Sequence, residues 1–435
     1  MAPRTPRARH AAPVRPDRDP PRSRPGPGRW PIAAAGAVVA VALAAVLTVV
    51  AVHWTSPGAQ PGPGLTLPSV PALTTHPASA GASHPAAKPK AATTLPRLSA
   101  AQLAGQRIIY SYDGLTPPAT LLDWISHGEV GGVIFFAGNV ASDSQLAGVI
   151  AELDRANASA SNPMRAYPLL LMTDQEGGEV RRLPGAPEQS EAQIGQSPDP
   201  GTAASAAGSS AAANLTGVGM NVNLAPVLDV YRAPGDFDDQ FGRSYSENPG
   251  SVSSLGADFI KAQQAGHVAA TAKHFPGLGA AAVSQDTDLR PVTLNVPLQQ
   301  LRSVDEHPYQ AAISAGVKLV MLSWAIYPAL DPGTPAGMSS KIINGELRQR
   351  LGFTGVTITD ALEAGALAPF GSIGHRATLA AGAGMDLLLC SQQNDVEGEQ
   401  ARISLQDDYT AGTLSHARFS AALDRIVALR ASLRR

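Results

Sequence analysis

A polar pair, Lys273-His274, ends an apolar stretch of the chain and is the first candidate for chemistry. Residues 268–272 before it predict a strand, and Phe275-Pro276-Gly277 ends that strand, because Pro lacks an N–H and Gly permits unusual backbone angles. A Lys and a His at a strand tip can bind a polar ligand. The alternative interpretation is a solvated Lys and a hydrogen-bonded His that only end a strand.

Other apolar runs end in the same way. Asp174 follows residues 169–173, Asp229 follows residues 221–226, and Asp360 follows Thr359. The carboxyl ends of parallel strands share one rim in a barrel, so we expect these side chains to meet there.

The mixture of charges on this rim favours a polyhydroxylated, largely uncharged ligand. Carboxylates and cations form strong charge-assisted hydrogen bonds to neighbouring hydroxyls, and Trp324, which ends a further run, offers a face for a sugar ring. A retaining glycosidase needs one carboxylate nucleophile and one acid/base. Asp360 lies on a rigid strand tip and is therefore suited to the role of nucleophile. Its alternative role is the N-cap of the following helix.

Other ligand classes fit the sequence less well. His274 has no second His at a metal-like spacing, and Asp236, Asp238 and Asp239 lack the spacing of a calcium loop. The single cysteine, Cys390, excludes a cysteine metal cluster, and a net charge of -2 gives no basic surplus for nucleic acid. We therefore expect no metal, no cofactor and no nucleic-acid partner.

Eight apolar runs alternate with longer helical stretches. They are continuous, not alternating, which is typical of a parallel sheet covered on both faces. Their number and the chain length predict a (β/α)8 TIM-like barrel. An open doubly wound sheet is the alternative, but no G-x-G-x-x-G follows the first run. The runs are 107–111, 132–136, 169–173, 221–226, 268–273, 318–323, 355–359 and 385–389.

Helical stretches are predicted between the runs, and one more is predicted after the last run. The residues 415–433 begin at Ser415, a plausible N-cap, and carry one apolar stripe, which we expect to pack on the outside of the barrel and to close the domain. The other stretches are 118–127, 143–156, 202–216, 251–265, 297–314, 339–351 and 372–381.

The N-terminal quarter of the chain predicts an anchor and a tether. Residues 1–29 carry eight Arg against two Asp and are expected to be a disordered cytoplasmic tail. Within 30–54, the 21 residues Ile32–Val52 contain one polar side chain, long enough for a helix to cross a membrane. A cleaved signal peptide is the alternative, but the apolar run is longer than such peptides carry. Residues 55–97 predict a flexible Pro/Ala-rich linker, and 98–435 the catalytic barrel.

Four motifs together resemble glycoside hydrolase family 3, in particular its single-domain, NagZ-type bacterial β-N-acetylhexosaminidases. The resemblance covers about residues 98–435 and implies a TIM-like barrel, retaining hydrolysis of terminal β-linked N-acetylglucosamine, and no metal. The motifs are DQEGG at 174–178 with Arg182, GRSY at 242–245, KHFPGLG at 273–279, and TDAL at 359–362.

Residue by residue, the resemblance implies that Asp360 is the nucleophile and that Asp174 holds ring hydroxyls away from the anomeric carbon. The remaining sugar-binding positions are then Arg182, Arg243, Lys273 and His274.

The chain departs from the family pattern in one loop. NagZ-type enzymes read KHFPGHG followed by Asp-Ser-His, whose His is the general acid/base. Here Leu278 replaces the first His, and no His occurs between His274 and His307. Asp286 or Asp288 serves as the acid if the loop desolvates it and raises its pKa. The alternative is that both carboxylates only shape the turn.

The sequence thus predicts an exported, monomeric, single-pass membrane protein whose extracytoplasmic domain acts on cell-wall-type glycans. A non-catalytic sugar-binding protein that has lost its acid is the second hypothesis. A β-glucosidase or a glycoside phosphorylase is the third.

Overall fold

The computed structural model describes residues 96–434. The predicted tail, the predicted membrane span Ile32–Val52 and nearly all of the predicted linker lie outside the described residues. Within 96–434, none of the helices combines the length and the apolar character needed to cross a membrane.

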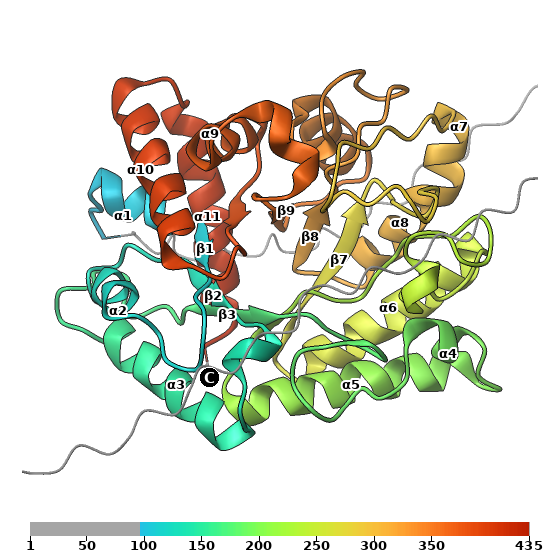
Figure 1. The fold of residues 1–435 in the computed structure, drawn as a ribbon, viewed down its shortest axis with the longest axis horizontal. Helices are drawn as coiled ribbons and strands as arrows, with labels where there is room; N and C mark the ends of the chain where they lie inside the picture. Colours follow the sequence, from blue (N-terminus) through green and yellow to red (C-terminus); the bar gives the residue numbers. More distant parts are fainter. Residues whose placement is uncertain (1–95, 435) are drawn as a thin grey trace, which may run out of the picture. The chain divides into compact units, whose positions relative to one another are not determined.

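Eight parallel strands of this region close into a barrel, as predicted (Figure 1). The barrel closes between its first and last strands, where Ile109 pairs with Gly132 on one side and Leu389 on the other. The strands are β1 Ile108–Tyr110, β2 Gly132–Ile134, β3 Leu170–Thr173, β6 Val222–Asn223, β7 Ala269–Phe275, β8 Leu319–Leu322, β9 Val356–Ala361 and β10 Leu387–Leu389. A small antiparallel hairpin, β4 Gln175–Gly177 and β5 Val180–Arg181, follows β3.

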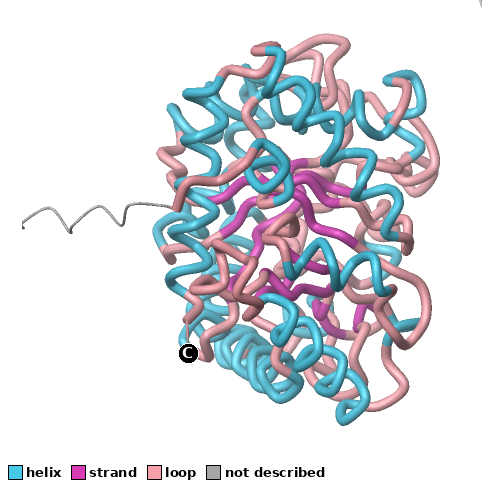
Figure 2. Tube along the Cα trace, turned by 90° about the vertical axis from the view of Figure 1, so that its left-hand side faces the viewer, coloured by secondary structure: helices cyan, strands magenta, loops and turns pink. Residues whose placement is uncertain are grey.

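Both faces of each strand are buried, which explains the continuous apolar runs. Ile109 and Ile134 belong to the cluster that fills the barrel, whereas Ile108 and Val133 pack against the helices. Successive side chains of a strand point to opposite faces, so a strand covered on both sides needs apolar residues at every position. In Figure 2 the strands form the centre and the helices surround them.

The helices largely follow the predicted stretches. They are α1 Ala100–Gly105, α2 Ala119–Ser126, α3 Asp143–Asn157, α4 Glu191–Gly195, α5 Pro200–Val218, α6 Pro249–Ala265, α7 Leu298–Gln300, α8 His307–Ser314, α9 Ile373–Ala383, α10 Asp395–Ala411 and α11 His416–Ser432. The stretch 297–314 is interrupted by a π-helical turn, η3 Leu301–Asp305, and 339–351 is the π-helix η5 Lys341–Arg350. Short 3-10 turns are η1 Ala137–Asn139, η2 Asp239–Phe241, η4 Ala336–Met338 and η6 Gly365–Phe370.

The sequence did not indicate α10, because this helix has no broad apolar stripe. Its buried side includes Gly398, Ala401 and Leu405 but also the charged Glu397 and Arg402. Small and polar residues on the packed face leave little periodic signal.

The expected position of the last helix was wrong in part. Ser415 does cap α11, accepting a hydrogen bond from the N–H of Arg418. However, Ile426 and Leu429 join the cluster inside the barrel. Arg425 binds Asp386, which precedes β10. Helix α11 therefore closes the N-terminal end of the barrel, because its stripe is wide enough to serve the barrel interior as well as the helix layer.

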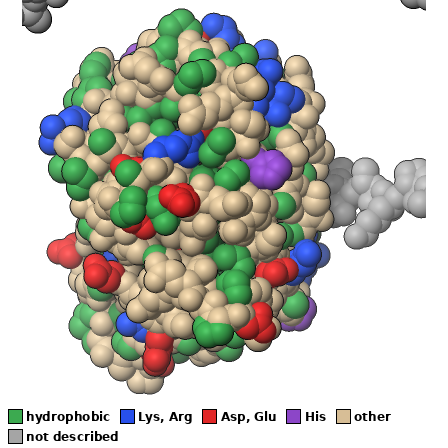
Figure 3. Space-filling model, turned by 90° about the vertical axis from the view of Figure 1, so that its right-hand side faces the viewer, with side chains coloured by type: hydrophobic (Ala, Val, Ile, Leu, Met, Phe, Trp, Pro, Cys, Tyr) green, Lys and Arg blue, Asp and Glu red, His purple; other side chains and the backbone are tan. Residues whose placement is uncertain are grey.

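Charged side chains of both signs are interspersed on the face shown in Figure 3, with no patch of one sign covering it.

Candidate active site

All eight predicted site residues line a single cavity of about 330 Å³ at the carboxyl ends of the strands. They lie at the ends of β7 and β9 or in the segments after β3, β6 and β7, so the barrel topology brings together residues separated by up to 186 positions (174 to 360). The residues are Asp174, Arg182, Arg243, Lys273, His274, Asp286, Asp288 and Asp360.

A buried ion network forms one wall of this cavity. The Lys273 Nζ lies 2.7 Å from Asp174 Oδ1 and 2.7 Å from Glu176 Oε1. The Arg243 guanidinium donates two hydrogen bonds to Glu176, from Nε to Oε2 at 2.9 Å and from Nη2 to Oε1 at 3.0 Å. Burial alone would raise the pKa of Glu176, but Arg243 and Lys273 outweigh it and lower that pKa to about 2. Glu176 therefore stays charged and fixes both cations.

Asp174 keeps one oxygen for a ligand. Its Oδ1 accepts the bond from Lys273, and its Oδ2 has no hydrogen bond to any residue that the structure describes. A carboxylate held by one oxygen can accept hydroxyl hydrogens with the other.

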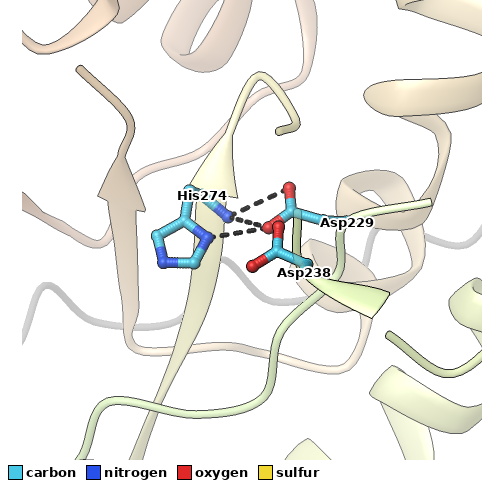
Figure 4. Close-up of side chains that lie close together, drawn as sticks. All are labelled: Asp229, Asp238 and His274. Atoms are coloured by element: carbon cyan, nitrogen blue, oxygen red, sulfur yellow. Dashed lines mark hydrogen bonds and ion pairs between the residues drawn. The ribbon is translucent and has the colours of Figure 1, made fainter. Parts of the chain in front are cut away.

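His274 is oriented by a second cluster, made with Asp229 and Asp238 (Figure 4). The His274 Nδ1 lies 2.7 Å from Asp229 Oδ2, and the Leu278 N–H donates to Asp229 Oδ1 at 2.6 Å. Burial, reinforced by Arg243, lowers the pKa of His274 to about 4. A neutral His that donates through Nδ1 presents Nε2 as an acceptor, so His274 can receive a sugar hydroxyl.

The two carboxyl groups behind His274 both have raised pKa values. Burial and the nearby Asp229 raise the pKa of Asp238 to about 7, and burial also raises the pKa of Asp229. Their oxygens and His274 could together surround a metal ion, because the three ligand atoms lie within 4.8 Å of one another. Arg243 Nη1, 3.1 Å from Asp238 Oδ1, and the N–H groups bound to Asp229 already supply positive charge there. The donor set fits a proton better than a divalent cation.

Asp360 lies half-buried near the end of β9 and faces the cavity. Burial and the neighbouring Asp288 raise its pKa to about 6, although His274 acts in the opposite direction. The alternative role as a helix N-cap is wrong, because Ala364 precedes η6 and Ser372 caps α9.

The loop that carries Asp286 and Asp288 is held over the cavity by backbone hydrogen bonds. The Gly365 N–H donates to the Asp288 carbonyl at 2.8 Å, and the Ala366 N–H donates to the Thr287 carbonyl at 2.9 Å. Both donors follow Asp360 on the same segment. The loop and the strand tip that bears Asp360 are therefore directly connected.

The two loop carboxylates differ in their surroundings. Asp286 Oδ1 accepts the N–H of Asp288 at 2.8 Å, so Asp286 shapes the turn. Asp288 is exposed overall, but its carboxyl group lies at the cavity wall, where partial desolvation and the Asp286 charge raise its pKa. Both residues stay candidates for the general acid, and the surroundings favour Asp288.

We expect Gly365→Ala to disturb this loop. A Cβ at position 365 would overlap the backbone carbonyl of Leu289, next to Asp288. A displacement of about 1 Å of a catalytic group can lower a rate about a hundredfold, so kcat should fall between about tenfold and a hundredfold. Gly148→Ala, in α3 with open space around the added Cβ, is the control. Unchanged kcat in Gly365→Ala would contradict a positioning role for these bonds.

Asp229 was expected on this rim but was given no role, and Glu176 and Asp238 were not named as site residues from the sequence. Glu176 lies within the DQEGG motif, but nothing in the local sequence separates Asp238 from its neighbours. Asp236 accepts the N–H groups of Arg232 and Ala233.

Trp324 does not provide the predicted sugar platform. It is 1% exposed, and its Nε1 donates to the Ala361 carbonyl at 2.7 Å, so it supports the end of β9. Aromatic faces at the cavity come instead from Phe136, Phe237 and Phe241.

A closed parallel barrel with carboxylates, fixed cations and a half-buried Asp around one cavity defines a class of protein, the carbohydrate-active barrel enzymes. Comparison with known proteins agrees. Residues 100–429 match the glycosyl hydrolase family 3 N terminal domain. The chain belongs to glycoside hydrolase family 3.

Named relatives extend this result. An uncharacterized secreted glycosyl hydrolase of Arthroderma benhamiae is 48% identical over 330 residues, 76% of this chain and 93% of the relative. A beta-hexosaminidase of Xanthomonas oryzae pv. oryzae is 34% identical over 287 residues, 64% of this chain and 82% of the relative.

One solved structure is similar across the barrel. A family 3 beta-N-acetylglucosaminidase from Paenibacillus superimposes with a TM-score of 0.72 at 32% identity, covering 78% of this chain. This chain spans 63% of the length of the Paenibacillus protein.

Proposed function

We propose that this protein is a retaining β-N-acetylglucosaminidase that removes terminal β-linked N-acetylglucosamine from glycans. One observation carries the proposal: Asp360 faces the same cavity as Asp174, Lys273 and His274, so one pyranose ring can touch all four. The beta-hexosaminidase and beta-N-acetylglucosaminidase relatives support the choice of sugar.

The proposed chemistry uses two carboxyl groups in two steps. The Asp360 carboxylate attacks the anomeric carbon and forms a glycosyl–enzyme ester while the glycosidic bond breaks. Asp288 gives its proton to the departing oxygen. In the second step Asp288 takes a proton from water, the resulting hydroxide attacks the anomeric carbon, and Asp360 is released. Two inversions retain the configuration.

The remaining side chains hold the sugar. Asp174 Oδ2 and His274 Nε2 accept hydroxyl hydrogens, and Lys273 and Arg243 donate to hydroxyl oxygens. These groups are held by buried bonds before the substrate arrives, so little ordering is needed on binding.

A substrate comparison tests the proposal. We expect 4-nitrophenyl β-N-acetylglucosaminide to be cleaved at least tenfold faster than the β-glucoside, with no acceleration by phosphate. Faster β-glucoside cleavage would indicate a β-glucosidase, and phosphate-dependent turnover a phosphorylase. Absence of turnover on an activated aryl glycoside, with N-acetylglucosamine still raising the melting temperature, would indicate a non-catalytic sugar-binding protein.

The pH dependence of kcat/KM should report the state of Asp360. Burial raises the pKa of this carboxyl to about 6. The nucleophile must be ionised, so kcat/KM should fall about tenfold per pH unit below pH 6, whereas an ordinary Asp would hold the plateau to about pH 4. A profile that is flat from pH 7 to pH 4.5 would contradict this assignment.

We also propose that the protein is anchored by Ile32–Val52 and exposes its barrel outside the cytoplasm, where cell-wall glycans are the natural substrate. The apolar length of this segment and the Arg-rich residues before it support the orientation. Membrane fractionation of the full chain, and protease protection of a tag placed after residue 435, test both parts. Recovery of the full-length chain in the soluble fraction would overturn the anchor.

A further inference from the structure

A second cavity, of about 590 Å³, lies at the opposite end of the barrel from the sugar cavity. Its walls come from η5, α9 and α11, and its lining reaches Gly384 and Met385, just before β10 begins. None of its lining residues borders the sugar cavity. The second cavity is therefore spatially separate from the sugar cavity.

The lining is rich in cations and lacks carboxylates. Four basic residues face it, and its other polar side chains are the neutral Ser340, Asn344 and Gln349. The four are Lys341, Arg348, Arg418 and Arg425.

The acids next to this cavity do not balance its cations. Buried Asp386 binds two of them, with Arg348 and Arg425 each at 2.7 Å. Lys341 pairs with Asp331 at 2.7 Å, and the Lys341 side chain is 68% exposed, so solvent weakens that pair. Two carboxylates thus face four cations.

Three guanidinium groups have donors that no residue in 96–434 accepts. In Arg425 the unused donor is Nη1, because Nε and Nη2 bind Asp386. Arg418 is exposed, and its side chain makes no hydrogen bond or ion pair with any residue in 96–434. The Arg348 side chain is 14% exposed. Its Nη1 and Nη2 already donate to the Gly355 carbonyl and to Asp386, so its buried Nε is the one donor without a partner among the same residues. Burial lowers the pKa of Arg348, Asp386 opposes that change, and the nearby Arg425 lowers the pKa further. A bound anion would reduce the repulsion between the two guanidinium groups.

We propose that this cavity binds a phosphate group carried on a small organic body. Guanidinium groups bind phosphate oxygens through paired N–H bonds, and several of them together suit a doubly charged oxyanion. The volume equals that of about 20 waters at ~30 Å³ each, far more than a bare phosphate fills. The Asn344 NH2 group already donates to Ser340 and to the Ala383 carbonyl, so Asn344 Oδ1 and the Gln349 amide remain for the attached group.

Titration calorimetry of the full chain in detergent tests the proposal with three probes. Inorganic phosphate tests the anion alone, glucose 6-phosphate a free phosphomonoester, and glycerophosphoglycerol the diester headgroup of an anionic lipid. We expect one site per chain with a Kd below about 1 mM for at least one organic phosphate, weakened by added salt because the contacts are ionic.

Variants identify the site. Arg418→Ala should weaken binding at least tenfold, and its exposed, unpaired side chain makes loss of folding unexpected. Arg155→Ala, at another exposed position without an ion pair, on α3, should bind as the unmodified chain does. Arg418→Ala should also cleave the aryl glycoside normally, so this test is independent of the proposed activity.

Three results would overturn the inference. They are no binding of any probe up to 10 mM, equal binding by Arg418→Ala, and displacement of the probe by N-acetylglucosamine, which would place it in the sugar cavity. Preference for glucose 6-phosphate would identify a free sugar phosphate as the ligand class, and preference for the diester a lipid headgroup; both support a phosphate site.

Discussion

Replacing Asp360 by Ala should reduce turnover of an aryl β-N-acetylglucosaminide by at least about 10³-fold, as expected when a covalent nucleophile is lost. No other carboxylate described here shares its position on a barrel strand at the cavity. An activated leaving group does not rescue this variant, because the ester cannot form. Initial rates with the 4-nitrophenyl substrate measure the effect.

Two controls make this result specific. Asp123→Ala, an exposed carboxylate on α2, should keep full activity. Asp360→Ala should remain folded, since burying a partly desolvated carboxylate costs free energy that Ala does not, and its melting temperature should be equal or higher. Normal turnover in Asp360→Ala would refute the proposed mechanism, and unfolding would require Asp360→Asn in its place.

Replacing Asp288 by Asn should separate substrates by their leaving groups. A general acid contributes about 10²- to 10⁴-fold, and it matters most when the departing oxygen is basic. Hydrolysis of a β-linked N-acetylglucosamine disaccharide should fall by that amount, whereas a 2,4-dinitrophenyl glycoside should be cleaved at nearly the unmodified rate. The ratio of the two kcat/KM values is the measurement.

Asp286→Asn is the matched comparison for this experiment. The Asn oxygen can still accept the N–H of Asp288, the bond that shapes the turn, so the effect should stay below about tenfold on both substrates. A large, leaving-group-dependent loss in Asp286→Asn, with none in Asp288→Asn, would reverse the assignment. If neither variant affects the disaccharide, the proton comes from a group outside the loop.

The ion network explains why a cavity with this many charges can bind an uncharged sugar. Glu176 is 1% exposed and holds Lys273 and Arg243, so the charges compensate one another within the wall. Their remaining hydrogen-bonding positions are fixed before the ligand enters, and this preorganisation makes charge-assisted bonds selective for hydroxyls.

Residue 278 illustrates how the loop has changed from the pattern that the family resemblance implies. The side chain of Leu278 is buried beside the cavity, and its N–H holds Asp229. The backbone still supports His274 through Asp229, while the side chain supplies no proton. The acid must therefore come from elsewhere, as Asp288 is proposed to do.

Sequence by itself determined the barrel and the rim of the site. Strands buried on both faces must be apolar at every position, so the eight runs were visible, and polar residues at their carboxyl ends could meet only at one end of a closed barrel. This reasoning placed Asp174, Lys273, His274 and Asp360 together.

Only the tertiary structure decided which neighbouring carboxylates serve the site and where α11 lies. Asp236 and Asp238 are two positions apart. Asp236 accepts a backbone N–H of its own loop, whereas Asp238 binds Arg243 in the site. Local sequence carries no information on the direction of a loop side chain, because groups on β4 and β7, distant in the chain, surround the Asp238–Arg243 pair and set that direction. The apolar stripe of α11 likewise specified burial but not the surface that buries it, since hydrophobic attraction has no direction.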